Sequence, residues 1–238
     1  MAMSLSALRS AGRALTLWAG GLLLAGGMPS SGAVELRDVL ARMDQSASKF
    51  RGLSAKVRKV SHTAVINETS VDAGSLVAKR KGKEFGFLVE FTEPAWRTVC
   101  FQGSAIEIYY PKINTVQVYD LGKQRDLVEE FLLLGFGTSG KNLVKNHNVK
   151  LLGEPQLRGH PTWHLELAPK SKQMSQHVKK IELWLDPSTA QPVQQKFYQA
   201  AGDYTQIEYS DLTLEPNLPD SAVALKVPPG AKREYPQK

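Results

Sequence analysis

Apolar residues alternate with polar ones through most of residues 74–119, and this alternation restricts the chain to a β-rich fold. Successive side chains of a strand point to opposite faces, so apolar residues at every second position share one face. The alternating residues are Phe85, Phe87, Val89 and Phe91, then Ile106, Ile108 and Tyr110, then Val116 and Val118. The stretch predicts antiparallel strands with one strongly apolar face, which must be covered.

Turn signals divide this stretch and the second half of the chain into further strands. Gly103-Ser104 and Pro111-Lys112 are typical of the turns between neighbouring antiparallel strands. Further strands are expected at residues 53–68, 149–152, 162–167, 178–185, 193–198 and 204–214, and an edge strand closing on prolines at residues 225–230.

Two segments show helical spacing instead. Residues 34–50 place Val39 and Met43 on one apolar stripe, and residues 122–134 do the same with Leu127 and Phe131. A long series of strands with two inserted helices predicts a curved antiparallel sheet whose helices lie against its concave side. One helix cannot fill the interior of a wide sheet, so we expect a half-covered apolar cavity.

The expected wall of this cavity consists of the apolar residues on the central strands and on the second helix. They are Phe85, Phe87, Val89, Phe91, Ile106, Ile108, Leu127, Phe131 and Leu132. The same residues would serve equally well as a filled hydrophobic core, because wall and core differ only in whether the space between them is occupied.

Residues 1–33 have the pattern of a secretory signal peptide. Arg9 and Arg13 precede a short apolar run, and small residues lead to Ala33. A membrane anchor is the alternative, but glycines interrupt the run, which is short for a bilayer span. We expect cleavage before Val34 and export to the periplasm.

Residues 34–238 are long enough for a single domain with a substantial core. Cys100 is the only cysteine, so this domain has no internal disulfide. The formal net charge of +7 favours anionic partners, but export argues against nucleic acid. We expect a monomer.

Signals for catalysis and cofactors are weak. The G-x-G-x-x-G match at residues 135–140 lacks the strand before it that a dinucleotide site requires. His160 and His164 lie four residues apart, a spacing that would place two metal ligands on one side of a helix. Pro161 lies between them and argues against a helix there. We therefore predict no enzyme activity, no cofactor and no metal.

Four segments resemble the periplasmic outer-membrane lipoprotein carriers, the LolA-like superfamily of outer membrane lipoprotein-sorting proteins. They are G-S-L-V-A-K-R at residues 74–80, F-x-x-E-F-T-E-P at residues 87–94, V-C-F-Q-G at residues 99–103 and I-Y-Y-P at residues 108–111. Lys81 stands where the family has a proline, and Gln102 where it has an aspartate.

The resemblance implies an unclosed, half β-barrel covered by an α-helical lid, whose interior holds the acyl chains of a lipoprotein or lipid. It implies a carrier that receives its cargo from an inner-membrane ABC transporter and delivers it to an outer-membrane receptor. Arg80 matches the family arginine that fastens the lid by hydrogen bonds; a surface charge in a basic turn is the alternative.

Two other functions stay open. One is an RseB-like regulatory module of the same fold, which senses lipid or lipoprotein and binds a membrane regulator. The other is an unrecognised hydrolase, which would require convergent polar residues in the cavity.

Overall fold

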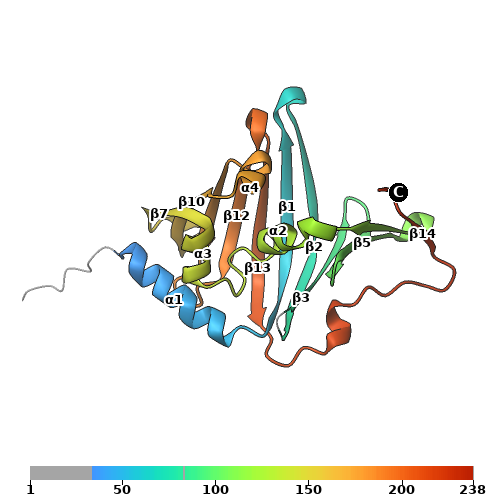
Figure 1. Ribbon diagram of the computed structural model, residues 1–238, viewed down its shortest axis with the longest axis horizontal. Helices are drawn as coiled ribbons and strands as arrows, with labels where there is room; N and C mark the ends of the chain where they lie inside the picture. Colours follow the sequence, from blue (N-terminus) through green and yellow to red (C-terminus); the bar gives the residue numbers. More distant parts are fainter. Residues whose placement is uncertain (1–33, 83, 238) are drawn as a thin grey trace, which may run out of the picture. The chain divides into compact units, whose positions relative to one another are not determined.

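The structure is a computed structural model that describes residues 34–82 and 84–237, so the expected signal peptide lies outside the described residues. Twelve strands form one sheet in the order β14-β6-β5-β4-β3-β2-β1-β13-β12-β11-β10-β7. Neighbouring strands are antiparallel, apart from β14, which runs parallel to β6. Within the described part of the chain β14 and β7 form the two edges, so the sheet is not closed into a barrel (Figure 1).

The strands follow the alternating segments closely. The first half contributes β1 (Gly52–Thr63), β2 (Glu68–Lys81), β3 (Glu84–Glu93), β4 (Arg97–Gln102), β5 (Ala105–Tyr110) and β6 (Thr115–Asp120). The second contributes β7 (His147–Gly153), β10 (Trp163–Pro169), β11 (Lys180–Leu185), β12 (Pro192–Tyr198) and β13 (Tyr204–Leu214). The short strands β8 (Gln156–Leu157) and β9 (His160–Pro161) pair only with each other.

The prediction of a C-terminal edge strand at residues 225–230 was wrong, because the edge strand lies later in the chain. Residues 225–231 form no strand, and the edge is β14 (Lys232–Glu234) instead. Lys232 pairs with Thr115 of β6, and its N–H donates to the carbonyl oxygen of Asn114. Pro228 and Pro229 have no N–H to donate to a ladder, so the chain pairs only after passing them.

Four α-helices accompany the sheet: α1 (Leu36–Lys49), α2 (Arg125–Leu132), α3 (Gly140–Asn146) and α4 (Lys172–His177). Helical spacing predicted α1 and α2. It missed α3 and α4, which are too short to show a clear period. Each begins at a serine that accepts a hydrogen bond from a backbone N–H, Ser139 from Asn142 and Ser171 from Met174.

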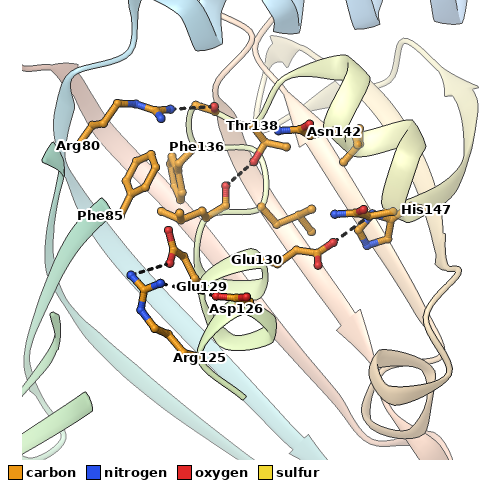
Figure 2. A pocket seen from close by; sticks show the side chains of 15 residues that line it. Arg80, Phe85, Arg125, Asp126, Glu129, Glu130, Phe136, Thr138, Asn142 and His147 are labelled. Carbon is orange, nitrogen blue, oxygen red and sulfur yellow. Dashed lines mark hydrogen bonds and ion pairs between the residues drawn. The ribbon is translucent and has the colours of Figure 1, made fainter. Parts of the chain in front are cut away.

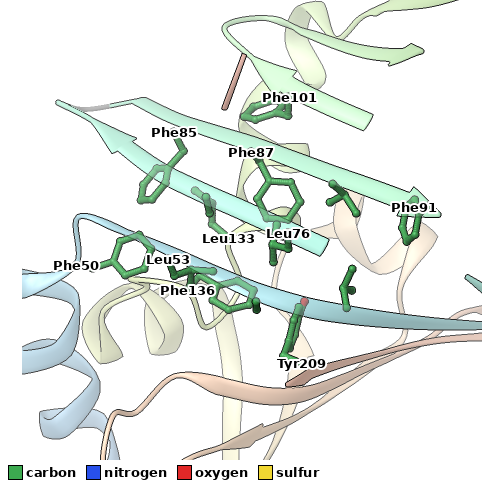
Figure 3. Packing of buried hydrophobic residues seen from close by; sticks show 14 residues of the cluster. Phe50, Leu53, Leu76, Phe85, Phe87, Phe91, Phe101, Leu133, Phe136 and Tyr209 are labelled. Atoms are coloured by element: carbon green, nitrogen blue, oxygen red, sulfur yellow. The ribbon is translucent and has the colours of Figure 1, made fainter. Parts of the chain in front are cut away.

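Two hydrophobic clusters lie on the same face of the sheet. In one, Val39 and Met43 of α1 and Leu143 of α3 pack on the strands β10 to β12. In the other, Phe50, Leu133 and Phe136 pack on β1 to β4 (Figure 3). The region between them is covered by α2, none of whose residues is fully buried. The expected mainly β fold with inserted helices and an open sheet is confirmed.

No helix among the described residues is both long and apolar enough to cross a bilayer.

Candidate functional site

An apolar cavity of about 470 Å³ lies between the sheet and α2. The strands β1 to β5 line one side, β12 and β13 the other, and the last turn of α2 contributes Phe131 and Leu132. The phenyl ring of Phe131 stacks at a tilt on that of Phe197, with ring centroids 4.2 Å apart. The helix thus contacts the far wall and leaves space between itself and the central strands.

Seven of the nine residues expected in the cavity wall do line this space. They are Phe87, Val89, Phe91, Ile106, Ile108, Phe131 and Leu132. On β3 the odd-numbered residues, and on β5 the even-numbered residues, lie on the face of the sheet that α2 covers. The structure therefore brings these side chains together.

Phe85 and Leu127 do not line the cavity, in contrast to the expectation. Phe85 lies toward the end of the sheet where Phe50 fills the space, with ring centroids 6.0 Å apart. Leu127 lies one turn before Phe131 on α2, and only the last turn of the helix reaches the cavity.

Further wall residues with largely apolar side chains come from β1, β2, β4, β12 and β13, none of which was assigned to the cavity wall from the sequence. They are Val57, Leu76, Val99, Phe101, Phe197, Ile207 and Tyr209. The alternation of Ile207 and Tyr209 was visible in the sequence. The sequence did not show which neighbouring strands would bring these two residues to the cavity.

The segment after α2 is tied to the sheet by buried hydrogen bonds. Gln195 of β12 donates from Nε2 to the carbonyl oxygen of Leu134 and accepts at Oε1 from the Tyr209 hydroxyl at 3.0 Å. Complete burial raises the pKa of Tyr209, which keeps its hydroxyl protonated and able to donate. Phe136 meets the Tyr209 ring edge-on, with centroids 4.8 Å apart.

Arg80 of β2 reaches the same segment, as Figure 2 shows. Its Nη2 donates to the carbonyl oxygen of Gly137 at 3.3 Å, and its guanidinium lies over the Phe85 ring, 4.4 Å from the centroid. Burial, with the nearby charge of Arg51, lowers the pKa of Arg80. Gly137 has φ +64°, a left-handed conformation that suits glycine, and an added Cβ would lie 2.7 Å from the Phe50 ring.

A second cavity of about 480 Å³ adjoins Arg80 and is polar (Figure 2). Arg125 and Glu129 of α2 form an ion pair there at 3.3 Å. His147 is buried, and its Nδ1 lies 4.0 Å from Glu130 Oε1. Burial lowers the pKa of His147, although the charge of Glu130 opposes this shift. Charges of both signs make this cavity unsuitable for acyl chains.

The features that suggested other chemistry lie apart from the apolar cavity. The glycines of residues 135–140 follow α2 rather than a strand. Cys100 is buried, its Sγ donates to the Val223 carbonyl oxygen at 3.3 Å, and burial raises its pKa, which suits a core residue. The described residues contain no cluster of three or more His, Cys, Asp or Glu residues that could hold a metal ion.

A family model described as "-like: Uncharacterized protein" matches residues 108–213. No curated protein matches the chain.

An uncharacterized conserved protein from Thermus thermophilus superposes with a TM-score of 0.54 at 15% identity, over 84% of this chain and 98% of that one. MucB superposes with a TM-score of 0.51 at 16% identity, over 82% of this chain and 64% of MucB. A LolA superfamily protein from Nitrosomonas europaea matches with a TM-score of 0.39 at 17% identity, over 81% and 99%.

At these identities the likeness concerns the fold alone. The MucB match covers most of the described residues, including the open sheet with helices on one face. This arrangement agrees with the half-barrel that the motifs of residues 74–111 imply. The chain shares its fold with the Thermus thermophilus protein and with MucB.

Proposed function

We propose that this protein is a carrier that binds the acyl chains of a lipoprotein or lipid in the apolar cavity under α2. The observation that carries the proposal is the cavity itself. Its volume of about 470 Å³ lies within the range of roughly 300–1,000 Å³ that is usual for ligand sites. Most of the residues in its wall are apolar. Each buried CH₂ group of a chain contributes about 0.8 kcal/mol, so a site of this kind can hold an acyl chain in water.

In this proposal α2 and the segment after it are the lid of a half-barrel. Support comes from the incomplete burial of α2 and from the few polar contacts that hold the segment. Arg80 is the latch, because its hydrogen bond to Gly137 joins β2 to the lid. A cargo molecule would enter when these contacts open.

The setting follows from the same proposal. Residues 34–238 act as one lipid-binding domain in the periplasm after removal of residues 1–33. An inner-membrane ABC transporter supplies the cargo, and an outer-membrane receptor accepts it. The protein itself has no catalytic activity in this proposal.

Uptake of a fluorescent fatty acid by the purified domain, together with native mass spectrometry of protein from periplasmic extract, tests the carrier. We expect binding that is lost in Phe131→Asp, which puts a charge into the cavity. The control Val65→Asp changes a residue that is 82% exposed and should bind normally. Absence of uptake by the folded wild-type domain would overturn the proposal.

A regulatory module is the second candidate, and the likeness to MucB favours it. MucB has been solved in complex with periplasmic MucA, so a protein of this fold engages a protein partner. In this role the cavity would sense lipid and change the affinity for a membrane protein. A partner whose binding depends on acyl occupancy, measured with lipid-free and lipid-loaded protein, would distinguish this role from transport.

A further inference from the structure

The polar residues of the apolar cavity are not distributed evenly along it. Lys59 of β1 and Arg97 of β4 are the two charged residues of the described chain that line it. Both lie at the end of the cavity next to the turn between β3 and β4. Arg97 is the first residue of β4. Lys59 pairs with Asp72, and the next residue of β2, Ala73, pairs with Glu93 at the end of β3. Gln199 and Thr205, which also line the cavity, lie at the neighbouring ends of β12 and β13.

A single carboxylate serves both cations. Asp72 Oδ2 lies 2.7 Å from Arg97 Nη2 and 3.4 Å from Lys59 Nζ. Burial disfavours the charged form of Asp72, but the hydrogen bond and charge of Arg97, with those of Lys59, hold its pKa below the ordinary value. Two positive charges therefore face one negative charge, and one unit of positive charge remains at this end.

Arg97 is held in a defined position. Its guanidinium lies over the Phe91 ring, 4.5 Å from the centroid, and its side chain is only 21% exposed. A guanidinium presents several donors in a rigid fork, so a planar group that pairs with one carboxylate retains donors for another oxyanion. Its low exposure places it where electrostatic interactions are stronger than in bulk water.

We propose that the cavity binds amphiphiles with an anionic headgroup, oriented with the carboxylate or phosphate at Lys59 and Arg97 and the acyl chain toward Phe101 and α2. This inference rests on the proposed acyl-binding function and adds the class of headgroup and its direction. A cationic headgroup would meet like charge at this end. An uncharged one would leave the excess positive charge without a partner.

The test compares amphiphiles that share one chain and differ in the headgroup: palmitate, hexadecanol and hexadecyltrimethylammonium, each below its micelle concentration. Displacement of a neutral fluorescent lipid from the purified domain gives the affinities. Since hydrogen bonds to a charged group are stronger than those to a neutral one, we expect palmitate to bind at least roughly tenfold more tightly than hexadecanol. The cationic amphiphile should bind most weakly.

Variants of Arg97 and of Asp72 should change the affinity for palmitate in opposite directions. Arg97→Gln should lower palmitate affinity roughly tenfold and leave hexadecanol affinity unchanged. Asp72→Asn frees both cations and should tighten palmitate binding. Arg97→Lys keeps the charge without the fork and should fall between wild type and Arg97→Gln. Arg58→Gln, on the opposite face of β1, is the matched control and should behave as wild type.

The outcomes separate this inference from the proposal beneath it. Equal affinity for palmitate and hexadecanol, or equal loss of both in a folded Arg97→Gln, would overturn the headgroup assignment and leave the carrier intact. Failure of every amphiphile to bind would overturn acyl binding itself. A palmitoyl lysophosphatidate that competes better than palmitate would identify phosphate as the preferred oxyanion, and the reverse order would identify carboxylate.

Discussion

The Arg80 guanidinium donates to the Gly137 carbonyl oxygen across 3.3 Å, and this bond joins strand β2 to the segment that follows α2. The two residues are far apart in sequence, and the Phe85 ring beneath the guanidinium fixes its plane. The contact gives α2 and the segment after it a polar tie to the first half of the sheet.

Arg80→Lys should loosen this segment. Lysine keeps a positive charge but lacks the planar fork that reaches the carbonyl while stacking on Phe85. We expect a loss of about 1 kcal/mol in the free energy of unfolding and faster amide hydrogen exchange across residues 133–138. Arg58→Lys, at a side chain that is 50% exposed, is the control. Unchanged amide hydrogen exchange in Arg80→Lys would show that Arg80 does not hold this segment against the sheet.

Ile108→Trp should distinguish an empty cavity from a filled core. Ile108 borders the cavity, so a larger side chain can occupy free space, and the free energy of unfolding should change by less than about 0.5 kcal/mol. Acyl binding should fall by at least roughly tenfold, since the space is taken. Leu183→Phe, at a fully buried position in the other cluster, should lose about 1–3 kcal/mol. A similar loss in the free energy of unfolding for Ile108→Trp would mean that the space beside Ile108 is filled as in a packed core.

His147 should make stability depend on pH near neutrality. Burial lowers its pKa in the folded state, so the unfolded chain binds a proton more readily. Stability is then complete above the unfolded pKa of about 6.5 and declines as the pH falls through and below that value. Glu130 faces the ring and Lys170 adds positive charge nearby, with opposite effects on the pKa.

Urea unfolding between about pH 8 and about pH 5 measures this dependence. His147→Gln should lose less stability than wild type on acidification. Residual dependence is expected from His164, whose pKa burial also lowers. The exposed His160→Gln is the control and should follow wild type. Identical slopes for His147→Gln and wild type would exclude His147 as the titrating group.

Gly86→Ala should expose the Cys100 thiol. Val223, in the 3₁₀ helix η5 (Asp220–Val223), covers both residues on the outer face of the sheet, and a Cβ on Gly86 would lie 2.5 Å from its Cγ2. The native thiol should resist a disulfide reagent, because it is buried and its pKa is raised. In Gly86→Ala the Val223 side chain must move, and the labelling rate should rise. Equal rates in the two folded proteins would contradict this packing.

Local sequence patterns determined most of the elements. Alternation at Phe85 to Phe91 and at Ile106 to Tyr110 predicted β3 and β5, and Gly103-Ser104 predicted the turn before β5. These features can be read in a single sequence because strand spacing and turn chemistry are local properties. The motifs of residues 74–111 added the expectation of an open sheet, which the structure has.

Tertiary structure alone decided which apolar residues border free space. Phe85 and Phe87 occupy equivalent positions on β3, yet Phe85 packs against Phe50 while Phe87 faces the cavity. The difference arises from distant segments that fill one end of the sheet and from the point at which α2 ends. The meeting of Lys59, Arg97 and Asp72 has the same origin. Their strands come together through long-range register, which alternation along one segment does not encode.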